Sequence, residues 1–247
     1  MNALYTGKLT PRLDVPEEFA RLIFGDEPKD PVRLHFERLK DEDRCAVVAY
    51  CEELDCLHED LGFLAEELDD SVADLYRRSF YRRRLAIIYH SDNLDFRVHA
   101  YREKAFKLVN HFLGLKIVDR LQVRGASADE STMGFNHKVL KMLEATKRLD
   151  LVTLLGAFRR DKALTQALKL RRLLAHAQAV RESETISATR RIDDQGLPRS
   201  AAEKIDRETN LDRLYEKVDK RVTTVHKRLE QFRRDLVAEL ERVVTRR

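Results

Sequence analysis

The C-terminal fifth of the chain repeats apolar residues at steps of three and four, and this pattern constrains the fold more than any other feature. The repeat runs from Leu211 to Val243. Because such steps match the 3.6-residue turn of an α-helix, residues 200–245 are predicted to form one helix with a single apolar stripe. That helix would be about 65 Å long at 1.5 Å per residue. The stripe is expected either to pack on the chain's own core or to pair in part with a second chain.

The rest of the sequence also favours helices. Only 8 Gly and 5 Pro interrupt 247 residues, and the common residues Leu, Ala, Arg, Glu and Lys are good helix formers. Four of the prolines fall within the first 31 residues, which predicts an irregular N-terminal arm with one short helix near 16–24. We therefore expect an all-α fold, namely a helical bundle with an irregular N-terminal arm and a long C-terminal helix.

Local signals place the boundaries of the expected helices. Pro31 is suited to a first helical turn, and Ser91 and Asp92 are typical residues of a helix N-cap. The expected helices before the last one cover 31–60, 66–90, 92–114, 135–148 and 159–182, with a loop at 123–134. The chain is expected to divide into an arm, a bundle, a polar linker and a long basic C-terminal helix, at 1–30, 31–182, 183–198 and 199–247.

Charge is segregated along the chain although the formal net charge is only +4. Residues 41–74 hold thirteen Asp and Glu against the single basic residue Arg44, and an arginine-rich stretch begins at Arg77. Residues 159–181 hold seven Lys and Arg against Asp161 alone. Each basic stretch is expected to face either an anionic partner or an acidic neighbour in the same fold.

Several function classes find no support in the sequence. No apolar run approaches the length of a membrane span, and the start of the chain lacks the apolar region of a signal peptide, so a cytoplasmic protein without membrane contact is expected. Cys45, Cys51 and Cys56 match no zinc spacing and are expected to be reduced core thiols. No carboxylate cluster and no Gly-rich loop predicts a metal or a cofactor.

The stretch "LRRLLAHAQAV" at 170–180 carries the strongest chemical signal. At 100° per residue, one polar stripe of an otherwise apolar helix contains Thr165, Lys169, Arg172 and His176. Arg171 lies at the edge of the apolar face. Guanidinium groups hold phosphate oxygens in a fork, and imidazole moves a proton near neutral pH. The stretch therefore predicts a phosphate-handling site, although arginines precede histidines at similar spacing elsewhere in this Arg-rich chain.

These residues resemble the HEPN superfamily of helical-bundle domains. The family signature is an Arg, usually a polar residue, a few further residues and a His on a late core helix, and here it reads Arg171, Arg172, "LLA", His176. The stretch "DNLDFRVHAYREKAFKLVNHFLGL" at 92–115 also looks like the earlier helix that packs against it. Two positions differ from the family pattern. Arg172 replaces the small polar residue, and Gln178 stands where some relatives carry a modifiable Tyr.

The resemblance implies a metal-independent endoribonuclease that cleaves single-stranded RNA. His176 would act as general acid or base, and Arg171 would stabilise charge on the phosphoryl oxygens, with Arg172 and Lys169 as further substrate contacts. Family members are commonly homodimers with a composite site, in toxin–antitoxin or phage-defence systems, so an antitoxin or partner protein is also implied. The alternatives are a non-catalytic bundle that binds RNA, a nucleotide or a partner protein, and a helical scaffold.

The expected 92–114 helix contributes further candidates. Leu94, Val98, Tyr101, Ala105, Leu108 and Phe112 form an apolar stripe. The opposite side carries the candidate site residues His99, Glu103 and Asn110 together with Phe96 and Phe106. Glu103 is expected either to orient Arg171 or His176 or to pair with a lysine of its own helix. His99 is interpreted as a packing histidine more readily than as a catalyst.

Overall fold

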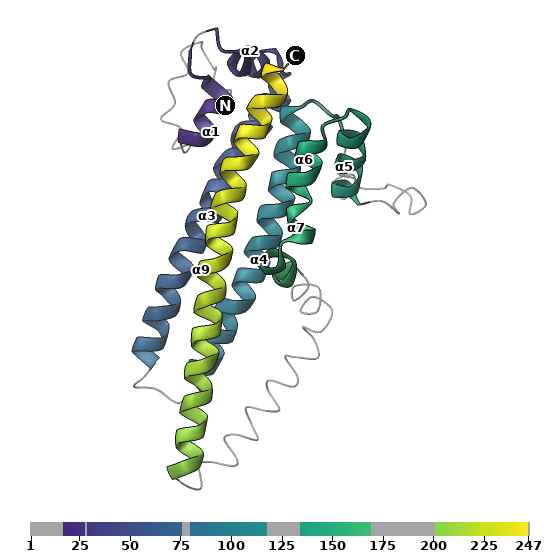
Figure 1. Cartoon of the computed structure of the whole chain (residues 1–247). Coiled ribbons are helices and arrows are strands. Elements are labelled where there is room, and N and C mark those ends of the chain that lie inside the picture. Colours follow the sequence, from purple (N-terminus) through teal and green to yellow (C-terminus); the bar gives the residue numbers. More distant parts are fainter. Residues whose placement is uncertain (1–16, 28, 76–79, 118–133, 169–200, 247) are drawn as a thin grey trace, which may run out of the picture.

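The computed structural model describes residues 17–27, 29–75, 80–117, 134–168 and 201–246, and these residues form helices and no strand (Figure 1). The predicted all-α bundle with a long C-terminal helix is therefore confirmed. None of the described helices is long and apolar enough to span a membrane.

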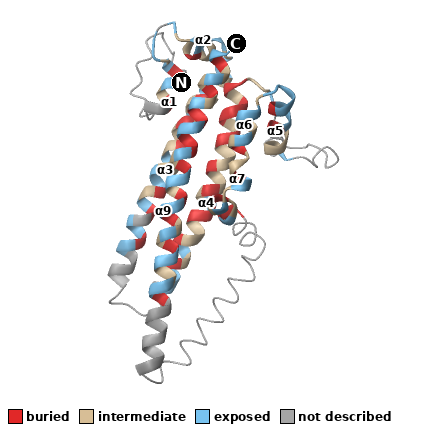
Figure 2. Cartoon of the chain, in the orientation of Figure 1, coloured by how far each residue is buried: buried red, intermediate tan, exposed pale blue. Residues whose placement is uncertain are grey.

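Three long helices lie side by side and form the body of the molecule (Figure 1). They are α3 (Asp41–Leu75), α4 (Phe80–Phe112) and α9 (Ala201–Thr245). α3 runs antiparallel to α9, as the salt bridge between Arg233 and Asp55 and the stacking of His58 on His226 show. It also runs antiparallel to α4, as the pairs Lys104–Glu53 and Arg97–Asp60 show. Figure 2 shows that their buried residues face one another along the bundle.

The apolar stripe of α9 is buried within its own chain. Its described members from Leu211 to Val244 pack into one continuous core with the stripes of α3 and α4. Tyr101 and Phe158 meet Phe232 edge to face at centroid distances of 6.3 and 4.8 Å. Of the two expectations for this stripe, packing on the chain's own core is the one observed. The length of α9 therefore gives no separate reason to expect a dimer.

The region expected to be one helix at 31–60 contains two helices. α2 (Pro31–Arg38) is capped by Asp30, whose carboxylate accepts a hydrogen bond of 2.7 Å from the backbone N–H of Val32. Leu39 is extended and ends α2, so that α3 begins afresh at Asp41. α3 then continues through the expected break at 60–66, because Leu61 and Leu64 are both buried in the core.

The expected boundary at Ser91 and Asp92 was wrong, because α4 is helical from Phe80 to Phe112. Ser91 does not cap a helix. Its hydroxyl accepts a hydrogen bond of 3.0 Å from Arg221 of α9, and the same guanidinium is bonded to Asp95 one turn later. These polar side chains are thus used by tertiary contacts and leave the backbone helix intact.

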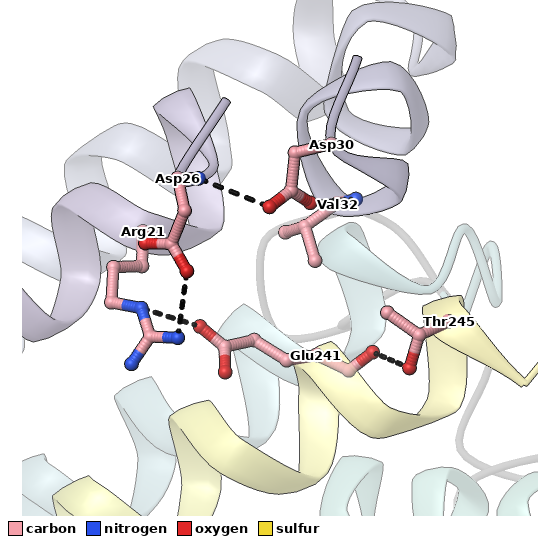
Figure 3. A network of polar contacts seen from close by, with 6 residues as sticks. All are labelled: Arg21, Asp26, Asp30, Val32, Glu241 and Thr245. Atoms are coloured by element: carbon pink, nitrogen blue, oxygen red, sulfur yellow. Dashed lines mark hydrogen bonds and ion pairs between the residues drawn. The ribbon is translucent and has the colours of Figure 1, made fainter. Parts of the chain in front are cut away.

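The N-terminal arm closes one end of the bundle. α1 (Glu17–Phe24) agrees with the short helix expected near 16–24, and it lies with α2 beside the C-terminal end of α9 (Figure 1). Arg21 bonds Asp26 at 3.1 Å and Glu241 of α9 at 3.3 Å (Figure 3). Burial raises the pKa of Glu241, and Arg21 opposes that shift. This network fixes the arm to the last turns of α9.

Three short helices cover the side of α4 and α9. α5 (Phe135–Ala145) agrees with the expected helix at 135–148, whereas the sequence did not predict α6 (Leu149–Leu155) or α7 (Ala157–Arg160). The expected helix at 159–182 is described only over residues 162–168. The expected loop at 123–134 and linker at 183–198 lie almost entirely outside the described residues.

Candidate functional site

The predicted catalytic pair, Arg171 and His176, lies outside the described residues, and so do Lys169 and Arg172. The structure describes residues 162–168 as a helix, which we call the motif helix because the sequence predicts that it continues through these four residues.

The start of the motif helix is capped by Asp161. One carboxylate oxygen accepts hydrogen bonds from the backbone N–H groups of Ala163 and Leu164, at 2.9 and 3.1 Å. An acidic cap satisfies N–H groups that have no partner within the helix and interacts favourably with the helix dipole. The helix thus begins three residues later than expected, after the short α7.

The motif helix buries the face that its sequence pattern predicts. Leu164, Ala167 and Leu168 are buried in the core, whereas Thr165 is half-buried. The Thr165 hydroxyl donates a hydrogen bond of 3.3 Å to the backbone carbonyl of Phe158. Thr165 is the first member of the polar stripe that the sequence continues through Lys169, Arg172 and His176, at four, seven and eleven residues further.

An ion pair connects the start of the motif helix to α9. Arg228 Nε lies 3.4 Å from the Asp161 carboxylate oxygen that does not cap the helix. Asp161 therefore acts on both elements, because one oxygen caps the helix and the other holds Arg228. The Arg228 side chain stays 61% exposed, so the link lies at the surface.

Glu103 and Asn110, both candidates from the sequence, make structural contacts. Glu103 accepts hydrogen bonds from Arg102 at 2.7 Å and from Asn136 at 2.8 Å, which ties α4 to α5. Lys104 of its own helix is not its bonding partner here, because Lys104 pairs with Glu53 of α3. Both hydrogen bonds to Glu103 end on the same carboxylate oxygen, Oε1.

Asn110 is 3% exposed and holds the turn that follows α4. Its amide donates to the carbonyl of Ile117 at 3.1 Å and accepts from the N–H of the same residue at 3.0 Å. Both ends of the amide are thereby used by one backbone segment. His99 lies half-buried on the same helix, and the apolar stripe opposite it is buried as expected.

A row of polar groups inside the bundle was not anticipated from the sequence. The ring of His58 on α3 stacks on His226 of α9 at a centroid distance of 4.3 Å. Burial lowers the pKa of His58 to about 4, with further lowering by Arg233 and His226, and burial also lowers the pKa of His226. Both rings are therefore neutral at physiological pH. The only sequence signal was that these histidines interrupt apolar helix faces.

Two arginines of α9 belong to the same set of polar groups inside the bundle, and each is paired with a carboxylate. Arg233 bonds Asp55 at 2.9 Å, and Arg221 bonds Asp95, whose side chain is 1% exposed. Burial raises the pKa of Asp95 to about 7, and Arg221 acts in the opposite direction. These pairs join α9 to α3 and to α4. The Arg233–Asp55 pair shows that part of the acidic surplus of 41–74 is matched inside the fold.

The cysteines agree with expectation only in part. Cys51 is buried and burial raises the pKa of its thiol, as expected of a core thiol, but Cys45 and Cys56 are exposed. Among the described residues, no group of three or more His, Cys, Asp or Glu side chains could hold a metal ion.

Comparison of the chain with protein-family models, with curated proteins and with solved structures gives no significant match. The resemblance to the HEPN superfamily therefore rests on the sequence motif alone and stays a prediction.

Proposed function

We propose that this chain is a metal-independent endoribonuclease of HEPN type that cleaves single-stranded RNA. The observation that supports the proposal best is the orientation of the motif helix at its start. Leu164, Ala167 and Leu168 face the core, which is the face that the amphipathic pattern assigns to the bundle. The pattern therefore assigns Arg172 and His176 to the half-buried side that begins at Thr165.

The proposed reaction needs only the RNA and the motif side chains. The ribose 2′-hydroxyl attacks the neighbouring phosphorus while His176 accepts or donates the proton, and the bond to the 5′ oxygen of the next nucleotide breaks. Arg171 stabilises the negative charge that grows on the phosphoryl oxygens. The products are a 2′,3′-cyclic phosphate and a 5′-hydroxyl. DNA is not a substrate, because it lacks the attacking hydroxyl.

The biological setting belongs to the same proposal. A homodimer with a composite site and a role as a toxin or phage-defence effector held by an antitoxin follow from the resemblance, and a cytoplasmic location is proposed with them. The dimer rests on the resemblance alone, because the stripe of α9 is filled within one chain.

The test is incubation of the purified chain with single-stranded RNA in EDTA, beside His176→Ala and Arg171→Ala. Each substitution is expected to lower the cleavage rate by about 10²–10⁴-fold, the usual contribution of general acid–base or electrostatic catalysis. Arg172→Ala is the matched control, since a small effect supports Arg171 as the catalytic arginine. Cleavage that persists undiminished in His176→Ala, or that requires a divalent metal, would contradict the mechanism.

A second candidate is a non-catalytic bundle that binds RNA or a partner protein. It is favoured by the ion pairs inside the bundle, because Arg221–Asp95 and Arg233–Asp55 use buried charge for cohesion between helices. Retained RNA binding with no cleavage under any condition would support this candidate over the nuclease.

A further inference from the structure

The outward face of α9 carries a row of exposed cations, most of which have no ion pair with a described residue. Arg213, Lys217, Lys220 and Lys227 are exposed, and their side chains make no ion pair or hydrogen bond with the part of the chain that the structure describes. At 100° per residue these four residues and Arg228 fall within an arc of about 100°. We call this set the α9 cation row. It extends over about 22 Å of helix.

The row ends where the motif helix begins. Arg228, its last member, is the residue that pairs with Asp161 at 3.4 Å, and Asp161 caps the motif helix. Any ligand that follows the row along α9 therefore arrives at the start of the helix that carries Arg171 and His176 in the sequence. Beyond Arg228 the outward face loses its uniform charge, because Asp235 appears there and bonds Gln231.

The chemistry of the face favours a polyanion over a protein or a membrane. The large apolar side chains that are exposed among the described residues lie on other helices, and none belongs to α9. A stable protein interface needs aromatic or apolar anchors at its centre, and a membrane-bound helix needs an apolar face to insert. This face presents exposed cations with threonines such as Thr223 and Thr224 between them, so that a ligand can bind it only through electrostatic contacts.

The acidic residues of this part of α9 make no ion pair with the row among the described residues. Asp212 and Asp219 fall outside the arc on one flank, and Glu216 lies at that edge. Inside the bundle the cations of α9 are paired with carboxylates, as Arg221 is with Asp95, whereas the members of the row other than Arg228 are exposed and make no ion pair with the described residues. Exposed positive charge without such a pair is available to an anionic ligand.

We propose that the α9 cation row binds the phosphate backbone of single-stranded RNA and leads the strand to the motif helix. The inference deepens the proposed function and rests on it for the destination of the strand. Because the face has no exposed aromatic side chain on which bases could stack, binding through the row is independent of base sequence.

The test compares two variants of the full chain with equal loss of charge. The row variant combines Arg213→Gln, Lys217→Gln, Lys220→Gln and Lys227→Gln. The control variant changes four exposed cations on other elements and combines Lys29→Gln, Arg38→Gln, Lys40→Gln and Lys141→Gln. Affinity for a fluorescein-labelled 12-nucleotide oligouridylate is measured by anisotropy between 50 and 300 mM NaCl.

The row variant is expected to bind the oligouridylate at least tenfold more weakly at about 50 mM salt than the wild type. Its slope of log affinity against log salt is expected to fall by about 3, because single-stranded nucleic acid contributes about 0.7 per neutralised phosphate. The control variant keeps the affinity and the slope of the wild type. Unchanged binding by the row variant, or equal loss in both variants, overturns the proposal.

Two further measurements separate this inference from the proposed function and from other partners. Cleavage of a dinucleotide, which is too short to reach along the row, is expected to proceed at the wild-type rate in the row variant. If the wild type cleaves no RNA but the row variant loses RNA binding, the proposed nuclease activity is contradicted and RNA binding by the α9 cation row is supported. If polyglutamate binds as tightly as oligouridylate, the partner is an acidic protein, and the assignment of RNA as the ligand is overturned.

Discussion

The two faces of α9 carry the same kinds of cation and put them to different uses. On the inward face, Arg221 is half-buried and Arg233 is buried, and they are bonded to Asp95 and Asp55 of the neighbouring helices. On the outward face, the members of the α9 cation row are exposed and without an ion pair to any described residue, apart from Arg228 at its end.

The difference shows that burial, and not residue type, sets the energetic role of a charge. A buried charge has lost its hydration, so removal of its partner leaves an uncompensated ion and costs several kcal/mol. An exposed lysine keeps its water, and its replacement changes stability by only a few tenths of a kcal/mol. The inward cations should therefore affect folding, and the outward cations should affect binding.

The largest effect is expected from Arg221→Met. The substitution leaves the Asp95 carboxylate, 1% exposed, without its cationic partner. We expect a loss of about 3 kcal/mol in the free energy of unfolding, at the low end for a buried pair because Asp95 can take up a proton instead. Urea denaturation at pH 7 measures the loss. The double variant Arg221→Met/Asp95→Asn should recover part of it, and a single variant as stable as the wild type would contradict the role of the pair.

A smaller effect is expected from acidification. The pKa of His58 is lowered to about 4 and that of His226 is lowered too, so between about pH 6.5 and pH 4 the unfolded chain binds protons that the folded chain does not. These two histidines therefore lower the stability as the pH falls through this range, whereas Asp95, whose pKa is raised to about 7, acts in the opposite direction. Solvent screening at these half-buried rings reduces the effect to on the order of 1–2 kcal/mol.

The control for the pH effect is His58→Phe, which keeps an aromatic ring against His226 and removes one titrating group. In denaturation curves measured from pH 7 to pH 4, the stability of this variant relative to the wild type should rise as the pH falls. Identical slopes in the two proteins would exclude His58 as the source.

Gly62→Ala is expected to stabilise the inward face. Gly62 lies within α3, where glycine costs about 0.5–1 kcal/mol relative to alanine. An added Cβ would lie 3.7 Å from His226 Nε2, an ordinary contact distance, so the gain should be realised. Thermal melting measures it. Gly156→Ala is the matched control, because its Cβ would lie 2.8 Å from Arg160 and 3.0 Å from the Val152 carbonyl. A lower melting temperature for Gly62→Ala would show that the stacked histidines leave no room.

The smallest effect on folding is expected on the outward face. Lys217→Gln/Lys220→Gln should change the free energy of unfolding by less than about 0.5 kcal/mol, because both side chains are exposed and make no ion pair with the described residues. Urea denaturation under the conditions used for Arg221→Met gives a direct comparison. A loss as large as that of Arg221→Met would show that the two faces do not differ.

The sequence predicted well what depends on neighbours three and four residues away. The stripe of α9 and the stripe from Leu94 to Phe112 are both buried as their periodicity required. The same holds for the face of the motif helix that contains Leu164 and Leu168. Periodicity is local information, because it records only which residues share one side of a helix.

The errors arose where a distant residue decided the outcome. Ser91 reads locally as a helix cap, but Arg221, which is 130 residues away, takes its hydroxyl and α4 continues. The catalytic pair Arg171 and His176 stays a prediction from the sequence, since it lies outside the described residues.

The sequence by itself determined that the described chain is helical, which faces its long helices bury and where their cations lie. Only the tertiary structure decided which cations are paired and which are left to solvent. Arg221 and Lys220 are neighbours in the chain, yet Arg221 is paired with Asp95 and Lys220 is exposed to solvent. The physical reason is that the energy of a charge depends on the groups and the solvent around it, and packing between distant segments sets both.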